Sequence, residues 1–267
     1  MARNNSNSLF GPLVMLLALI AGGLIYFYIL GNPLNFIGGD TNNHPVEEGF
    51  RKTLGLMYKG GYIVPLLIAL LIIVITISIE RLISISSAKG KGSVENFVRR
   101  IKGLLDSGDV RTALNECDAQ RGSVANIVKS GLEKYDEMAT DTGLTQDQKI
   151  LAIKKEIEES TSLELPMLQK NLVILSTIAS VATLIALLGT VLGMIKAFSA
   201  IANAGAPDTA ALSTGISEAL INTALGIGIS SLAIILYNVF STSIDKLTYN
   251  IDEASFSITN SFATRHK

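Results

Sequence analysis

Four stretches of the chain are apolar enough to cross a lipid bilayer. A transmembrane helix needs about 20 mostly apolar residues, and the shortest of the four has eighteen without a charge. The stretches are Leu9–Leu30, Tyr62–Ile79, Asn171–Ile195 and Ala219–Phe240. The pattern therefore predicts an all-α, multi-span helical membrane protein.

The first apolar stretch also has features of a signal peptide. Arg3 precedes it, and Ala18 and Ala21 could form a cleavage site. The apolar run nevertheless continues through Tyr26–Leu30, beyond the 7–15 residues of a usual signal-peptide core. This length favours a retained span, with cleavage as the alternative.

Basic residues predict the orientation of the spans. The region Ser84–Gln169 holds twelve Lys and Arg, whereas the loop Ala197–Glu218 holds none. By the positive-inside rule, the large middle region and the C-terminal tail face the cytoplasm. We expect an N-terminal transmembrane segment (1–31), an outward-facing linker (32–61), a second transmembrane helix (62–83), a cytoplasmic helical domain (84–169), a transmembrane hairpin (170–241) and a cytoplasmic tail (242–267).

The middle region has helical periodicity throughout. An N-cap-like Ser93 starts the first helix, and Val110–Ala119 and Val124–Tyr135 follow with aligned apolar positions. A long helix starts at Gln146 and leads towards the third span, so long helices extend into the cytoplasm. Pro166 predicts a kink in it near the membrane surface. Glu80 and Arg81, at the inner end of the second span, are interpreted as an interfacial anchor.

Small hydroxyl residues recur every seven positions on the third and fourth spans, so each set lies on one helical face. The sets are Ser176, Thr183 and Thr190, then Thr223 and Ser230 with Tyr237. Such faces are tolerated where they line a bundle interior or a polar pathway. The alternative is packing, because Gly189, Gly193, Gly226 and Gly228 permit close helix contact.

Two charges stand at the outer ends of these spans. Lys196 follows Thr190 by six residues and Glu218 precedes Thr223 by five, so an antiparallel hairpin places them at similar depth. We expect an ion pair or a shared site at the rim. The alternative is that Lys196 alone extends to the interface.

Several function classes are poorly supported. His44 and His266 are the only histidines, and neither a metal site nor a catalytic triad can be assembled convincingly. Cys117 is the only cysteine, so no intrachain disulfide can form. We expect no enzyme activity, no cofactor and no nucleic-acid partner. The spans hold no Asp; either the chain moves no protons, or another chain brings the acid.

Two motifs resemble the MotA/TolQ/ExbB proton channel family, and most closely its ExbB members. They are Leu187–Met194 and Gly215–Gly226, and the resemblance extends over roughly Tyr62 to Asp245. It implies a bacterial inner-membrane stator: a ring-shaped homo-oligomer, pentameric in relatives, embedded in membrane lipid. An ExbD-like single-span partner with a membrane aspartate would carry the proton, and a TonB-like protein would receive the work. Carried over by position, Thr190, Thr223 and Glu218 are the functional candidates.

The chain departs from the family pattern at three places. Thr183 and Ala186 stand where relatives often have Pro and Gly, Lys196 replaces a usually uncharged position, and the first span exceeds the usual three-helix plan. Three other functions stay open: a TolQ-like stator that drives TolA, a MotA-like flagellar stator, and a passive scaffold whose hydroxyl faces only pack.

Overall fold

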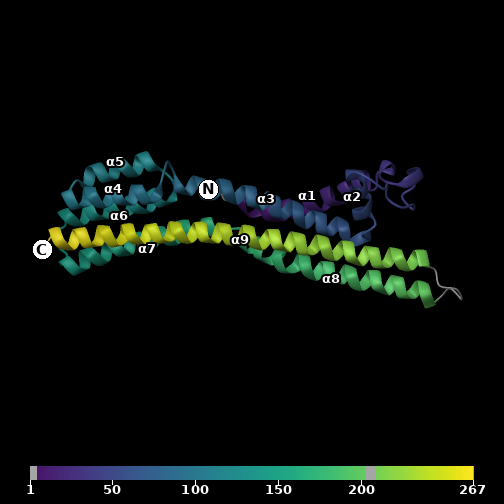
Figure 1. The fold of residues 1–267 in the computed structure, drawn as a ribbon. Coiled ribbons are helices and arrows are strands. Elements are labelled where there is room, and N and C mark those ends of the chain that lie inside the picture. The colour runs from purple at the N-terminus through teal and green to yellow at the C-terminus, as the bar shows by residue number, and fades with distance from the viewer. Residues whose placement is uncertain (1–4, 203–208, 267) are drawn as a thin grey trace. The chain divides into compact units, whose positions relative to one another are not determined.

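The computed structural model describes residues 5–202 and 209–266, all of whose elements are helical apart from turns and one isolated bridge between Phe36 and Pro45 (Figure 1). The chain divides into two compact units. We call Met1–Ile79 with Val173–Tyr237 the membrane unit, and Glu80–Leu172 with Asn238–Lys267 the polar unit. Four of the described helical stretches are long and apolar enough to span a membrane. The prediction of an all-α membrane protein is confirmed.

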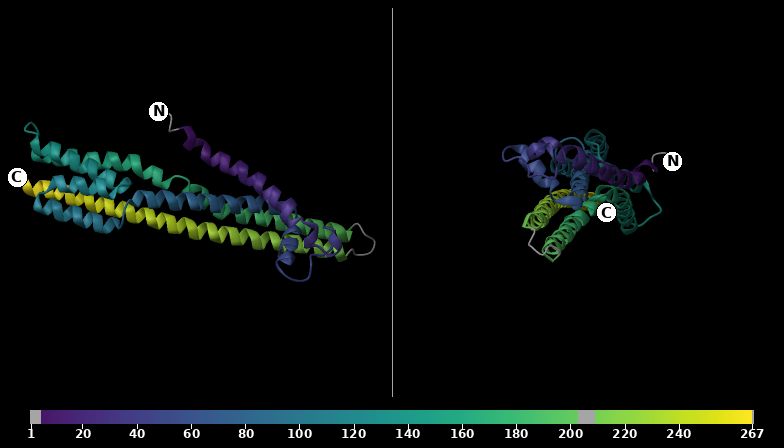
Figure 2. Two further views of the ribbon diagram at one scale, coloured as in Figure 1. Left: turned by 90° about the horizontal axis from the view of Figure 1, so that it is seen from above. Right: turned by 90° about the vertical axis from the view of Figure 1, so that its right-hand side faces the viewer.

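The first span continues as helix to Leu30. Helix α1 (Asn5–Leu24) passes directly into a π-helical turn, η1 (Ile25–Leu30). Near its end α1 meets α3 (Val64–Lys89) (Figure 2). Gly22 permits this contact, since a Cβ there would lie 2.6 Å from the Pro65 carbonyl oxygen.

The segment expected to be a linker is structured and packs against the end of the first span. It contains two 3₁₀ turns (Pro33–Asn35 and Ile37–Gly39), helix α2 (Phe50–Tyr58) and a third 3₁₀ turn (Gly61–Ile63). The Tyr26 hydroxyl donates to the Tyr58 carbonyl oxygen at 3.1 Å, and the two rings stack with centroids 4.7 Å apart. Its polar, glycine-rich part therefore forms turns, which lead into α2.

The polar unit contains the helices that periodicity predicted. They are α4 (Val94–Ser107), α5 (Val110–Gln120), α6 (Ser123–Thr140) and α7 (Gln146–Gln169), packed with the end of α9 (Thr209–Arg265). Side chains start three of them: Ser93 and Asp109 accept from backbone N–H groups of α4 and α5, and Thr145 forms a capping box with Gln148. Buried apolar residues such as Phe97, Ile127 and Phe262 form the core.

The junction between α7 and α8 (Leu172–Ala202) differs from the sequence expectation. Helix α7 continues through Pro166 and ends at Gln169, and the break lies at Lys170 and Asn171. Asn171 has φ 65°, a left-handed conformation that Asn adopts more readily than most residues. The break in the helix therefore lies about one helical turn beyond Pro166.

Arg81 also differs from its expected place. Its side chain is only 2% exposed, so it does not extend into the interface as an anchor would. Within the expected cytoplasmic tail (242–267), α9 continues without a break as far as Arg265.

Cys117 lies in the core of the polar unit, and burial raises the pKa of its thiol to about 12. We predict that N-ethylmaleimide at pH 8 modifies Cys117 at least about tenfold more slowly in the folded protein than in denaturant, because the thiolate is the reactive form. Mass spectrometry over time measures both rates. Equal rates would contradict the buried position.

The same shift has a consequence for stability. The thiol of the unfolded chain has a pKa of 9.0, below the folded value, so below pH 9 the thiol is protonated in both states and does not change the free energy of unfolding. As pH rises from 9 towards 12, the unfolded chain loses the thiol proton first, and the free energy of unfolding falls.

Candidate functional site

Helices α8 and α9 lie side by side in the membrane unit and approach closely (Figure 1). Gly193 and Gly215 face each other, and a Cβ on Gly193 would lie 2.8 Å from the Gly215 carbonyl oxygen. Gly226 sits against Ala186 in the same way. Backbone contact of this kind is the packing that small residues permit between membrane helices. Gly228, in contrast, has no atom within 4 Å of its Cβ position.

The two hydroxyl faces meet at Thr190 and Thr223. Their Oγ1 atoms are 2.5 Å apart, and either hydroxyl can donate to the other. Thr190 can also donate to the Ala186 carbonyl oxygen at 3.0 Å, and Thr223 to the Ala219 carbonyl oxygen at 3.1 Å. Both side chains are partly buried. The two hydroxyls form a hydrogen bond that links the helices, but neither hydroxyl acts as an acid at neutral pH.

The remaining hydroxyls do not join this contact. Ser230 is buried and donates to the Ala179 carbonyl oxygen of α8, which is the interhelical packing role. Ser176 donates to Val173 in its own helix, and Thr183 is partly exposed. Among the described residues of these two sets, Thr190 and Thr223 are the pair whose hydroxyls contact each other.

The ion pair expected at the rim is present. Lys196 Nζ donates to Glu218 Oε2 at 3.0 Å, with side chains 63% and 14% exposed. The backbone of Gly61 packs directly against the Glu218 carboxylate and leaves no room for a side chain. The backbone of Gly61 also has a φ of 76°, which disfavours any residue with a side chain at this position. Glu218 is therefore enclosed by the opening turn of α3, whereas Lys196 faces outward.

A second lysine contributes to the field at the rim. Lys59 Nζ donates to the carbonyl oxygens of Thr41 and Asn42 at 2.9 and 3.1 Å. Burial lowers the pKa of Lys59; the Asp40 carboxylate opposes this shift, and the positive charge of Lys196 adds to it. Among the described residues no group of three His, Cys, Asp or Glu side chains could hold a metal ion.

Asn222 is a polar residue of the site that the sequence analysis did not single out. It is fully buried, and its Nδ2 donates to the Gly60 carbonyl oxygen at 2.9 Å. Its side chain also fills the space beside Gly189 of α8. Within the described residues its Oδ1 has no partner. The available signal was an amide inside an apolar run, directly before Thr223, because such groups are expensive in a membrane.

Comparison with known families covers this site. Residues 119–253, about half of the chain, match the model of the MotA/TolQ/ExbB proton channel family. The chain belongs to this family. The matched region includes all of α8 and most of α9, with the threonine contact, the rim ion pair and Asn222. Helices α1 to α4 lie outside it.

Individual members of the family show similarity over different lengths. The chain is 28% identical to the Tol-Pal system protein TolQ of Pseudomonas aeruginosa over 163 residues, which are 57% of this chain and 71% of TolQ. It is 35% identical over 86 residues to the putative biopolymer transport protein ExbB-like 3 of Synechocystis, covering 32% and 41% of the two chains. The biopolymer transport protein ExbB of Pseudomonas putida is 39% identical over 82 residues, 31% of this chain and 25% of ExbB. These similarities do not separate a TolQ-like from an ExbB-like member.

The contact between Gly189 and Asn222 yields a prediction. A Cβ at Gly189 would lie 2.8 Å from Asn222 Nδ2 and 2.9 Å from Cγ, so Gly189→Ala forces Asn222 away from Gly60. We expect a loss of about 1–3 kcal/mol of stability, the usual cost of overpacking. Thermal unfolding of the detergent-extracted protein measures it.

Gly228→Ala is the matched control, since it adds the same methyl to a membrane helix at a position with open space. It should unfold at the wild-type temperature or slightly above. Equal unfolding temperatures for Gly189→Ala and Gly228→Ala would show that Asn222 is not held in this contact.

Proposed function

We propose that this chain is the proton-channel and stator subunit of a bacterial inner-membrane complex that couples the proton motive force to mechanical work, as an ExbB-like protein. The observation that carries the proposal is the direct contact between the Thr190 and Thr223 hydroxyls. It lies on two close-packed membrane helices inside the family match. Glu218 and Lys196 form the polar rim of the same hairpin.

The proposed proton pathway needs an acid from a second chain. Hydroxyl groups can relay hydrogen bonds, but a proton carrier at mid-membrane needs a group that titrates. The membrane part of the hairpin offers Tyr237 and no carboxylate inward of Glu218. An ExbD-like single-span partner would supply the missing aspartate. In this arrangement several copies of the chain, five by resemblance, form a ring around the partner helices, with Ser176, Thr183 and Ser230 on the same hairpin.

The orientation follows from charge. With twelve basic residues in the region 84–169 and none between Ala197 and Glu218, the large loop and the C-terminus face the cytoplasm. The rim ion pair then faces outward. One elementary charge that crosses 100 mV releases about 2.3 kcal/mol, so a few protons suffice to reorganise a protein interface. A TonB-like protein would use this energy for uptake across the outer membrane.

A TolQ-like function is the second candidate, because the similarity to a TolQ covers the largest share of this chain among the relatives named above. In that case the work would serve the cell envelope rather than uptake. A MotA-like stator and a passive scaffold are the remaining alternatives. The interhelical bond of Ser230 and the packing of Gly193 and Gly226 are what a scaffold would also need.

Thr223→Val distinguishes a proton pathway from a scaffold. It keeps the side-chain shape, and Thr190 retains the Ala186 carbonyl as its acceptor, so the hairpin should fold. We expect driven activity to fall at least about tenfold in cells that rely on this gene. An ExbB-like role is measured by uptake of a radiolabelled iron(III) chelate too large for outer-membrane pores, and a TolQ-like role by resistance to detergent.

Thr177→Val is the matched control, because Thr177 is exposed on α8 and donates only to Val173 of its own helix. It should leave both assays at wild-type levels. Wild-type activity in Thr223→Val, at equal amounts of protein in the membrane, would favour the scaffold.

The partner is tested by native mass spectrometry of the protein gently extracted from its own membranes. We expect a homo-oligomer that carries at least one small single-span protein with an aspartate in its span. A homo-oligomer without such a chain, or a monomer bound only to soluble protein, would contradict the proposed proton motor.

A further inference from the structure

A buried arginine lies at the start of the polar unit. Arg81 of α3 is 1% exposed, although nothing about its place at the end of an apolar span requires burial. Removing a guanidinium from water is costly unless its charge and its donors are satisfied. The groups that pair with Arg81 therefore indicate which part of the structure its burial stabilises.

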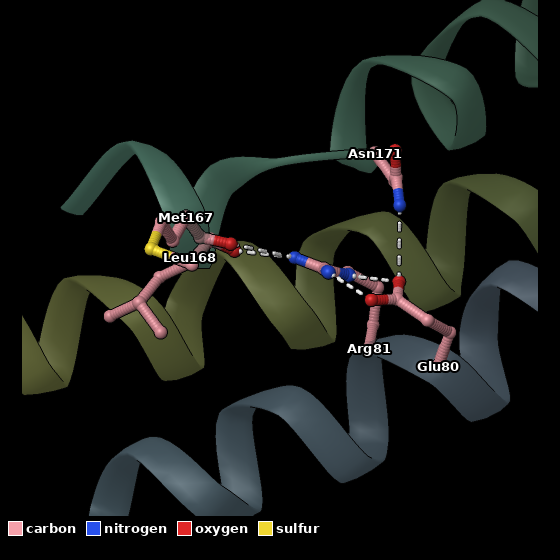
Figure 3. A network of polar contacts seen from close by, with 5 residues as sticks. All are labelled: Glu80, Arg81, Met167, Leu168 and Asn171. Carbon is pink, nitrogen blue, oxygen red and sulfur yellow. Dashed lines mark hydrogen bonds and ion pairs between the residues drawn. The ribbon is translucent and has the colours of Figure 1, made fainter. Parts of the chain in front are cut away.

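Arg81 bridges α3 and the last turn of α7 (Figure 3). Its Nε donates to Glu80 Oε2 at 2.6 Å, and its Nη2 forms an ion pair with Glu80 Oε1. Its Nη1 donates to the carbonyl oxygen of Leu168 at 2.8 Å and is 3.4 Å from that of Met167. One side of the guanidinium thus neutralises a carboxylate, and the other reaches the backbone of α7.

These carbonyl groups are ones that α7 cannot satisfy itself. The last four C=O groups of an α-helix lack partners within the helix, and α7 ends at Gln169. A cation there is also favoured by the helix dipole.

Glu80 holds the other side of the break. Its Oε2 accepts from Asn171 Nδ2 at 3.3 Å, as Figure 3 shows. Asn171 is the residue with the left-handed backbone, directly before α8. Arg81 and Glu80, which are adjacent on α3, therefore form hydrogen bonds on both sides of the two-residue connection between α7 and α8.

We propose that Arg81 is a positioning residue that fixes the geometry of the α7–α8 junction, so that work done by the membrane helices is transmitted into α7. The inference rests on the proposed function, because it concerns how proton flow is coupled rather than how protons pass. The guanidinium, as donor to α7, is the essential part. Glu80 orients the guanidinium and secures Asn171.

The test compares Arg81→Gln with the wild-type protein in its native complex. Hydrogen–deuterium exchange of the amides in residues 168–173 reports the junction. Proton flux into lipid vesicles and the driven activity in cells report coupling. We expect exchange at the junction to rise at least about tenfold, flux per complex to stay within about twofold, and driven activity to fall at least about tenfold. A purely structural role would lower flux and activity together.

Arg100→Gln is the matched control. Arg100 pairs with Glu116 at 2.9 Å in the same unit, but its side chain is 52% exposed, and its loss should change none of the three measurements. The double variant Arg81→Gln with Glu80→Gln removes the unpaired carboxylate. It should stay uncoupled, because the α7 carbonyls still lack their donors. Recovery of coupling would show that Arg81 only neutralises Glu80 and would overturn the proposal.

Arg81→Lys covers the case in which Arg81→Gln fails to assemble. A single ammonium cannot serve Glu80 and α7 with the geometry of a guanidinium, so we expect intermediate exchange and partial uncoupling. Unchanged exchange, or faster exchange with full activity, would overturn the proposal. A parallel loss of flux and activity in Arg81→Lys would do so too. If Thr223→Val leaves flux and activity intact, the proposed function itself fails.

Discussion

The close approach of α8 and α9 is the constraint on which the candidate site depends. Gly193 and Gly215 bring the two backbones into contact, and only at such a distance can two short threonine side chains meet across the hairpin. Longer side chains at the glycines would separate the helices and leave each hydroxyl to its own backbone. The small residues that look like mere packing therefore also create the polar contact.

Several polar side chains of this hairpin bond to a backbone carbonyl group, as Thr190, Thr223 and Ser230 do. Such partners matter in a bilayer, since its core offers no water to satisfy polar groups. Asn222 is only partly satisfied, because its Nδ2 donates to Gly60 while its Oδ1 is unpaired within the described residues. Neighbouring positions therefore have different roles: Asn222 holds α3 against the hairpin, and Thr223 forms the contact with Thr190. The partners of a polar residue in a span indicate which role it has.

A recurring device in this protein is the capping of helix C-termini by side chains from other elements. Such ends have carbonyl groups without partners, and here amide or guanidinium donors from other segments of the chain reach them. In each case a side chain donates to a carbonyl oxygen in the last turn of a helix: Asn35 to η1, Gln120 to α3, Arg265 to α4, Arg81 to α7 and Gln146 to α9. Each bond thus gives that carbonyl group a partner. Arg81 differs in two ways: it is buried, and its ion-pair partner Glu80 also accepts a hydrogen bond from Asn171.

Sequence patterns alone predicted the four spans and the helices of the polar unit, and they placed hydroxyl residues at seven-residue intervals on the last two spans. These features follow from the length of apolar runs and from the helical period, which are local properties. The sequence also placed Lys196 and Glu218 at one depth, because helical rise is constant. Four features became visible only in three dimensions: Thr190 meets Thr223, Asn222 donates to Gly60, Arg81 is buried, and α7 ends beyond Pro166. Each of these depends on contacts between residues far apart in the chain, and no local pattern specifies which distant donor will reach a given carbonyl group.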